Sequence, residues 1–471
     1  MKNNKDVFEV KFGLKSFLTV CGILLGIMIL VGVLTFVIPA GEYSVDADGK
    51  IIADSFHLLE NSTRLPVWRW FTAPIEALIF GEGNFNIIQI ILVLLFLGGT
   101  FKILDRTGSL NALVQLIIHK FYKKRYLLIW IITLFMMLLA SFFGLQEELL
   151  ILFPIFLVFA RAMKWSKVQA ISLILITTGV GFTTATFNPF TIGIASELAG
   201  VSILSGLWYR AIIFVVLYFL TSLYLVFMAK RDEKKNLYAD EETAFEEITK
   251  EELADFSKKS TKVIILFLTV LAVIVLASVI PPVADLGIGM LLMAVTFVVG
   301  AFIIGLKDLS AKETFKAFLQ GVKDLAPSIV IILLAFSVKY IADNGSILHT
   351  IFYHCHKYIS GQSPYVAVIL LYILILVFEF FIPGSLAKAL LLIPLLTIAP
   401  IPNISVNIIL LAFLFGDGYT NILYPTCGTL LVGLSLAEVS FATWLKKTAL
   451  FQLALFIISV GFLLLAVYIG L

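Results

Sequence analysis

The sequence predicts an all-α polytopic membrane protein built from two inverted repeats. Its 471 residues are 60% hydrophobic and only 14% charged, a composition that one water-soluble globule cannot bury. Residues 144–154 (GLQEELLILFP) and 384–394 (GSLAKALLLIP) also follow one pattern, 240 positions apart. Each repeat is predicted to contain a re-entrant helical hairpin and a broken transmembrane helix, an arrangement typical of secondary transporters.

The duplication continues beyond these segments at a nearly constant offset. The further equivalent pairs are Gly179 and Gly416, Gly181 and Gly418, Thr183 and Thr420, Pro189 and Pro425, Trp208 and Trp444, and Arg210 and Lys446. In both copies, polar residues, glycine and proline interrupt an apolar segment at the same place. Such interruptions survive inside a membrane only where they line a protein cavity.

Several other functions are excluded by charge and motif spacing. A net charge of +3 is too small to indicate a nucleic-acid partner. The three cysteines, Cys21, Cys355 and Cys427, lack disulfide or metal-ligand spacing and are interpreted as structural thiols. His349, His354 and His356 lie together in a predicted outer loop, but their spacing would point neighbouring rings apart on a helix. The sequence therefore predicts no metal site, no bound cofactor and no enzyme.

The orientation follows from the distribution of lysine and arginine, which are enriched in short cytoplasmic loops. Residues 1–15 are basic and lie inside, so the apolar segment 16–38 is predicted to be an uncleaved first helix. The acidic residues 41–60 then lie outside, and 86–104 returns inward. These assignments predict a multi-pass protein of the cytoplasmic membrane with a cytoplasmic N-terminus.

The first hairpin is predicted from a length that is too short for two crossings. Only 36 residues, Tyr126 to Arg161, separate two basic clusters that both belong inside, whereas two spans need about 40 residues and a turn. A re-entrant hairpin that turns near Gly144 fits this length. Two short tilted spans with the glutamates outside remain the alternative.

The next crossing, about residues 168–200, is expected to consist of two half-helices joined by unwound backbone at Gly179, Gly181 and Asn188-Pro189. In the second half, an amphipathic segment, 310–325, should place Phe315, Phe318 and Leu319 toward lipid.

The second repeat starts inside whereas the first starts outside, which makes the pair inverted. The predicted organisation is an N-terminal helix and interfacial scaffold segment (1–85), the first repeat (86–229, with its hairpin at 126–161), a cytoplasmic linker (230–262), scaffold helices (263–325), and the second repeat (326–471, with a hairpin at 365–401 and a broken helix at 405–436).

The functional site is predicted where the two hairpin tips meet the two broken crossings. Glu148 and Lys388 occupy equivalent positions with opposite charge, and ionisable residues at membrane depth are functional by default. A buried ion pair that only fastens the hairpins is the alternative. The candidate substrate-binding residues are Gln146, Glu147, Glu148, Thr184, Asn188, Ser385, Lys388, Asp417, Thr420 and Asn421. The candidate backbone and cation-coordinating residues are Gly144, Gly179, Gly181, Pro189, Gly384, Gly416, Gly418 and Pro425.

Several segments together resemble the YfcC-type branch of the anaerobic C4-dicarboxylate carriers. They are IPAGEY (38–43), GLQEE (144–148), GVGFTTATFNPFTIGIA (179–195), FGDGYTNILYPTCG (415–428) and WLKK (444–447). The resemblance covers nearly the whole chain and implies the ion-transporter superfamily fold. It also implies a homodimer with a scaffold domain and an elevator-type transport domain. Members are described as carriers of C4-dicarboxylates or as arginine–ornithine-type exchangers.

The sequence departs from this branch at the second tip, where Lys388 stands in place of a neutral amide. Its ammonium could replace a coupling cation, making transport ion-independent or proton-linked, or it could hold a substrate carboxylate. Glu147, Glu148 and Asp417 outnumber Lys388, which favours an amino acid over a dianion. The alternative is a C4-dicarboxylate carrier coupled to sodium or protons, and a channel or membrane sensor is less favoured. The predicted partners are a small-molecule substrate and the lipid bilayer.

Overall fold

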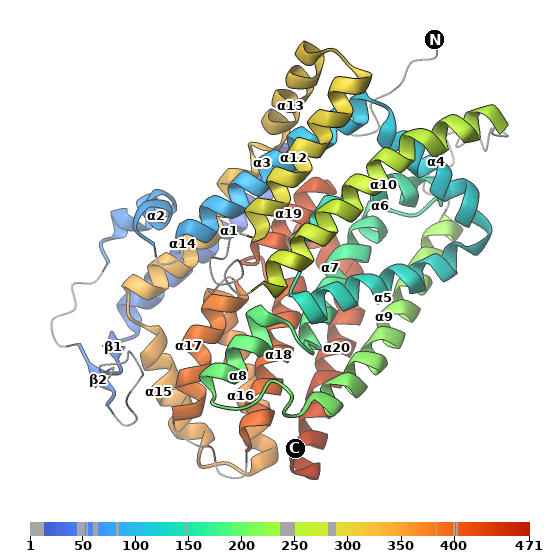
Figure 1. The fold of residues 1–471 in the computed structure, drawn as a ribbon. Helices are drawn as coiled ribbons and strands as arrows, with labels where there is room; N and C mark the ends of the chain where they lie inside the picture. Colours follow the sequence, from blue (N-terminus) through green and yellow to red (C-terminus); the bar gives the residue numbers. More distant parts are fainter. Residues whose placement is uncertain are drawn as a thin grey trace.

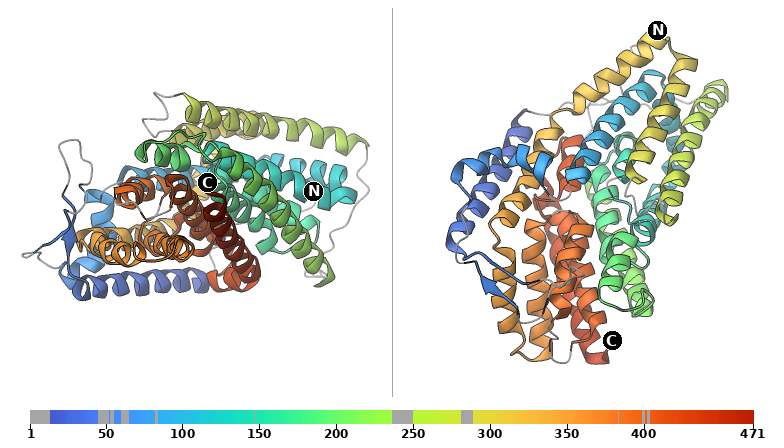
Figure 2. Two further views of the ribbon diagram at one scale, coloured as in Figure 1. Left: turned by 90° about the horizontal axis from the view of Figure 1, so that it is seen from below. Right: turned by 60° about the vertical axis from the view of Figure 1, so that its left-hand side comes forward.

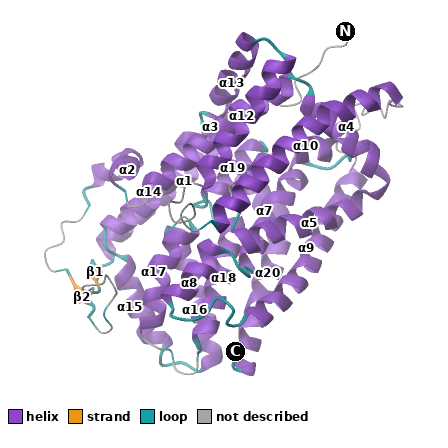
Figure 3. Cartoon of the chain, viewed as in Figure 1, coloured by secondary structure: helices purple, strands orange, loops and turns teal. Residues whose placement is uncertain are grey.

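The computed structural model describes residues 14–44, 52, 55–59, 65–81, 84–146, 148–235, 250–280, 289–382, 384–398, 401 and 404–471. Regular structure in these residues is almost entirely helical (Figure 3). Seven of the described helices are long and apolar enough to cross a membrane, or eight if α13 and the adjoining α14, bent by 42°, form one span. The chain is therefore a multi-pass membrane protein, as its composition predicts.

The described helices and strands fall into two parts of the chain. The first part of the chain contains α1 (Leu14–Val37), β1 (Gly41–Glu42), β2 (His57–Leu58), α2 (Val67–Phe80), α3 (Asn84–Arg106), α4 (Ser109–Phe121), α5 (Arg125–Phe143), α6 (Phe153–Ala162), α7 (Lys167–Thr183), α8 (Ile194–Leu198) and α9 (Leu207–Lys235). The second part contains α10 (Lys250–Val279), α12 (Gly289–Asp308), α13 (Ala311–Leu325), α14 (Ser328–Asn344), α15 (Leu348–Ile359), α16 (Pro364–Phe381), α17 (Ser385–Ile398), α18 (Val406–Leu423), α19 (Gly428–Leu436) and α20 (Phe441–Ile469).

Three helices in each part of the chain pack in a matching way. Helix α5 packs on α7 and α9, and in the second half α16 packs on α18 and α20. The two sets meet where α7 packs against α18, in the middle of the molecule (Figure 1). The strands β1 and β2 pair antiparallel, Gly41 opposite Leu58, at the edge of the helical body (Figure 2).

Glycine and serine define where the interrupted helices end and begin. Helix α5 ends at Gly144, which adopts φ +69°, and Gly384 adopts φ +89° just before α17. Glycine tolerates this left-handed backbone because it has no Cβ. The side chains of Ser166 and Ser405 cap α7 and α18 by accepting the backbone N–H of the residue three positions on. The two halves thus use matching caps.

The glycine pairs do not form the unwound backbone expected of them. Gly179 and Gly181 lie inside α7, and Gly416 and Gly418 lie inside α18. Their role is close approach: a Cβ on Gly418 would lie 2.1 Å from the backbone nitrogen of Thr183 and 2.5 Å from the carbonyl oxygen of Gly179. The breaks instead follow the helices, after Thr183 and after Leu423.

Two expectations about individual side chains are also wrong. Phe318 does not face lipid with Phe315 and Leu319, which are 55% and 50% exposed. Its ring packs over Gly99 and beside Phe302, because the missing Cβ of glycine leaves room for it.

The three grouped histidines lie on a helix, α15, rather than in a loop. Burial lowers the pKa of His349, while nearby Glu42 opposes that shift. No group of three metal-ligating side chains occurs in the described part of the chain.

Candidate functional site

A buried charged cluster lies between α16, α17 and α18. The Lys388 ammonium donates to Glu379 Oε2 at 2.9 Å and to Asp417 Oδ1 at 2.8 Å. The three side chains belong to residues that are at most 2% exposed. A buried charge is stabilised only by close partners of opposite sign. Lys388 therefore links α17 to α16 and to α18.

Two hydroxyl groups complete the cluster. Thr420 Oγ1 donates to Glu379 Oε2 at 2.6 Å, and Ser385 Oγ donates to Asp417 Oδ1 at 3.0 Å. Glu379 Oε1 and Asp417 Oδ2 have no hydrogen-bond partner among the described residues. Two carboxylates share one ammonium, so with both ionised the cluster carries one surplus negative charge and two unused acceptor atoms.

The local sequence explains why these side chains meet. Asp417, Thr420 and Asn421 are three and four positions apart in α18, a spacing that places them on one helical face. Ser385 and Lys388 share a face of α17 for the same reason, and Gly384 turns the chain so that α17 starts beside α18. The cluster therefore depends on the second hairpin as a unit.

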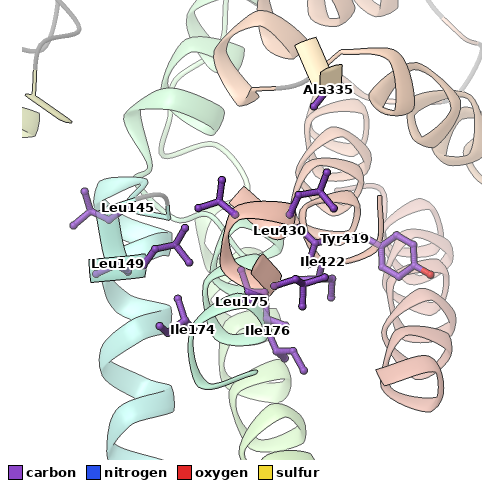
Figure 4. Close-up of a cluster of buried hydrophobic side chains, with 14 of the residues drawn as sticks. Leu145, Leu149, Ile174, Leu175, Ile176, Ala335, Tyr419, Ile422 and Leu430 are labelled. Atoms are coloured by element: carbon purple, nitrogen blue, oxygen red, sulfur yellow. The ribbon is translucent and has the colours of Figure 1, made fainter. Parts of the chain in front are cut away.

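The tip of the first hairpin reaches the same helix. Asn421 Nδ2 donates to Gln146 Oε1 at 3.0 Å, and both residues are buried. Figure 4 shows Leu145 and Leu149 of this tip at one side of a buried apolar cluster that also contains Ile174 and Leu175 of α7 and Ile422 and Leu430 of the second half. Glu147 lies outside the described residues, and Glu148 begins a short 3-10 helix, Glu148–Leu152.

The remaining candidates from the first half hold the α7 break in place. The Ser141 carbonyl accepts the backbone N–H groups of Thr186, Phe187 and Asn188 at 3.0, 3.2 and 3.1 Å. Asn188 Nδ2 donates to the Ala140 carbonyl, and a Cβ on Gly144 would lie 2.4 Å from Asn188 Oδ1. These contacts fasten the end of α5 to the break rather than line the charged cluster.

Thr184 likewise stays with its own helix, because its hydroxyl donates to the Val180 carbonyl at 3.0 Å. Pro189 begins a five-residue π-helical segment, and Pro425 lies in the break between α18 and α19. The structure therefore brings together Ser385, Lys388, Asp417 and Thr420, and separately Gln146 and Asn421.

Glu379 is the member that the sequence reasoning missed. It is a single carboxylate in the apolar segment 364–381, and the rule that an ionisable residue within a membrane span marks function would have identified it. The internal repeat hid it, because the repeat directs attention to the tip and Glu379 lies one turn before it.

Helices that are long and apolar enough to span a membrane, with a buried charged cluster between three of the helices, are typical of a membrane transport protein. The chain belongs to the family of C4-dicarboxylate anaerobic carriers, DcuC, whose family model matches residues 17–468. This confirms the family resemblance carried by the motifs.

Two individual relatives share about a quarter of their aligned residues with this chain. A protein of Escherichia coli (strain K12) named "Putative basic amino acid antiporter YfcC" is 26% identical over 92% of this chain and 93% of its own length. An uncharacterized protein of Haemophilus influenzae is 24% identical over 78% of this chain and 72% of its own.

Two solved transporter structures are similar over nearly their whole length. The match to the YdaH transporter of Alcanivorax borkumensis covers 97% of this chain and 98% of the transporter's chain, with a TM-score of 0.43 and 15% identity. Neisseria gonorrhoeae MtrF, from a class of antimetabolite efflux pumps, covers 94% of each chain, with a TM-score of 0.40 and 14% identity.

Proposed function

We propose that this protein is a secondary transporter that exchanges amino acids bearing an extra cationic group, such as arginine and ornithine, across the cytoplasmic membrane. The observation that carries the proposal is the surplus negative charge of the Glu379–Lys388–Asp417 cluster. An ammonium or guanidinium group would neutralise that charge and would supply donors to Glu379 Oε1 and Asp417 Oδ2. The name of the Escherichia coli relative supports the same substrate class.

The substrate carboxylate needs a different partner. Helix α17 begins at Ser385, and α19 begins after Cys427 without a side-chain cap. The positive end of the helix dipole favours an anion at such helix starts. The two ends of an amino acid would then bind at the breaks and in the charged cluster.

For the transport cycle we propose an elevator in which the two hairpins and the two broken helices move together against the remaining helices. The matching packing of α5 on α7 and α9 and of α16 on α18 and α20 supports inverted repeats. The close backbone contact of α7 with α18 supports a single moving body. A homodimer with a cytoplasmic N-terminus is the assembly that we propose for it.

A C4-dicarboxylate carrier coupled to sodium or protons is the second candidate. The family description favours it, and Lys388 would then anchor a substrate carboxylate after leaving one of its acidic partners. This candidate must also place a dianion beside Glu379 and Asp417, which is unfavourable unless both are protonated.

Counterflow in proteoliposomes separates the two candidates. Labelled L-arginine, L-ornithine and succinate are offered in turn, with and without a sodium gradient. We expect exchange of the two amino acids without sodium, because Lys388 occupies the place of a coupling cation. Succinate counterflow alone would overturn the amino-acid assignment, and sodium-driven uptake would overturn the role given to Lys388.

A further inference from the structure

We propose that Glu379 carries the proton that is exchanged for the cationic group of the substrate. This inference rests on the proposed function, which it deepens by naming the coupling ion and the residue that binds it. The substrate-free cluster then contains a protonated Glu379 beside an ion pair of Lys388 and Asp417. When a cationic group enters, the proton leaves.

Charge balance is the first step of the argument. Glu379 and Asp417 are buried, and Lys388 is the one cation within hydrogen-bond distance of them in the described structure. An uncompensated charge inside a membrane protein is costly. One proton on either carboxyl group makes the substrate-free cluster neutral.

The helix ends decide which carboxyl group takes the proton. Glu379 lies in the last turn of α16, where the negative end of the helix dipole disfavours a carboxylate. Asp417 instead contacts Ser385 and Lys388, in the first turn of α17, where the positive end of the dipole favours it. The proton therefore belongs on Glu379.

Hydrogen-bond geometry offers the protonated group a partner. Thr420 Oγ1 lies 2.6 Å from Glu379 Oε2 and 3.2 Å from the Asp417 carbonyl oxygen. A protonated Glu379 can donate to this hydroxyl, which then donates to the carbonyl. When Glu379 is ionised, the hydroxyl turns and donates to it. Thr420 accommodates both states without a movement of the backbone.

The other elements packed on α16 leave this balance unchanged. Helices α14, α15, α18 and α20 contact α16. The buried residues of α15 and α20 include no charged side chain. The ionisable side chains of α14 are engaged elsewhere: Lys339 pairs with Asp343, and Tyr340 forms hydrogen bonds with Arg69 and Glu76 of α2. The phenols of Tyr372 in α16 and of Tyr424, directly after α18, interact electrostatically with Glu379. Tyr419 of α18 is the third phenol in the region.

The proton is tested first without any substrate. Infrared spectra of the purified full-length protein at neutral pH should contain the carbonyl-stretch band of a protonated carboxyl group. Glu379→Gln should remove this band and should fold, because it preserves the Lys388–Asp417 pair. The matched control Glu197→Gln, at an exposed glutamate of α8, should leave it unchanged. Thr420→Val should shift its frequency, since the carboxyl group loses its hydrogen-bond acceptor.

Substrate binding tests the exchange itself. In weakly buffered solution, L-ornithine should release about one proton per molecule bound, and its dissociation constant should rise about tenfold for each unit by which the pH falls. Glu379→Gln should abolish both effects.

The outcomes separate the two proposals. Absence of the band in the wild-type protein, or its survival in Glu379→Gln, overturns the proton site even if amino-acid counterflow is observed. If the expected band is present but no amino-acid counterflow is observed, the proton site is supported and the proposed substrate is overturned.

Discussion

At the residue scale, the two hairpins differ in chemistry although they share a pattern. The second contributes Lys388 to a buried cluster with Glu379 and Asp417, whereas the first contributes Gln146, which bonds to Asn421. In the aligned repeat, Leu139 and Val180 stand where the second half has Glu379 and Asp417. The described cluster of Glu379, Lys388 and Asp417 thus draws all three of its charged members from the second half of the chain.

Removing the lysine alone should destabilise the protein strongly. Lys388→Gln leaves two buried carboxyl groups without a cation and is expected to lower the free energy of unfolding by about 3–5 kcal/mol. Adding Asp417→Asn should restore most of this loss, because the remaining Glu379 can stay protonated. Thermal unfolding in detergent measures both variants.

Lys446→Gln is the matched control for this prediction. Lys446 is exposed on α20, so its replacement should change stability by about 0.5 kcal/mol or less. Equal stability of Lys388→Gln and Lys446→Gln would show that the cluster contributes nothing to folding.

At the element scale, periodicity and span length predicted most of the helices, because hydrophobic length depends directly on the sequence. The α7 and α18 breaks were misplaced by a few residues. Gly179 and Gly418 were interpreted through their backbone freedom, whereas their actual role depends on a neighbour far away in sequence. Single-sequence reasoning cannot locate such a contact, since the partner helix is set by tertiary packing.

The crossing of α7 and α18 should not tolerate a methyl group. Gly418→Ala places a carbon 2.1 Å from the Thr183 backbone nitrogen, so the helices must separate, at a cost of about 1–3 kcal/mol. Gly461→Ala in α20 is the matched control, because nothing lies within 4 Å of its added carbon. Unfolding temperature and helicity by circular dichroism measure the difference. Indistinguishable variants would refute the close crossing.

The first hairpin tip should be closed to the outside. Leu145 is 1% exposed and belongs to a buried apolar cluster (Figure 4). In a background without other cysteines, Leu145→Cys should resist an impermeant thiol reagent applied from outside, whereas Leu204→Cys, at a position that is 60% exposed, should react. Strong labelling of Leu145→Cys in every transport state would favour two full spans over a re-entrant hairpin.

At the scale of the whole molecule, the multi-pass helical class and the family were predictable because they depend on composition and on motifs spread along the chain. The assembly of the charged cluster was only partly predictable. Ser385, Lys388, Asp417 and Thr420 were identified from the repeat. Glu379 and the separation of Asn188 from the cluster required the packing of α5 and α16 against their partners.

The two ends of the chain should lie on opposite sides of the membrane. The reason is that an inverted second repeat ends outside if the first repeat ends inside. Alkaline phosphatase fused after Leu471 should be active, and green fluorescent protein fused at the same position should not fluoresce. Fusions after position 240, in the predicted linker, should behave in the opposite way. The same reporter pattern at both positions would contradict the inverted arrangement.

The position of the Glu379–Lys388–Asp417 cluster in the second half of the chain has a consequence for how such a protein can change over generations. Under the proposed function, replacements at residues 379–421 would alter what is recognised, while the first half continues to supply the helices that pack against them. Random mutagenesis followed by selection on a new nutrient should accordingly recover altered preference mainly in the second copy, and second-site suppressors of folding defects mainly in the first.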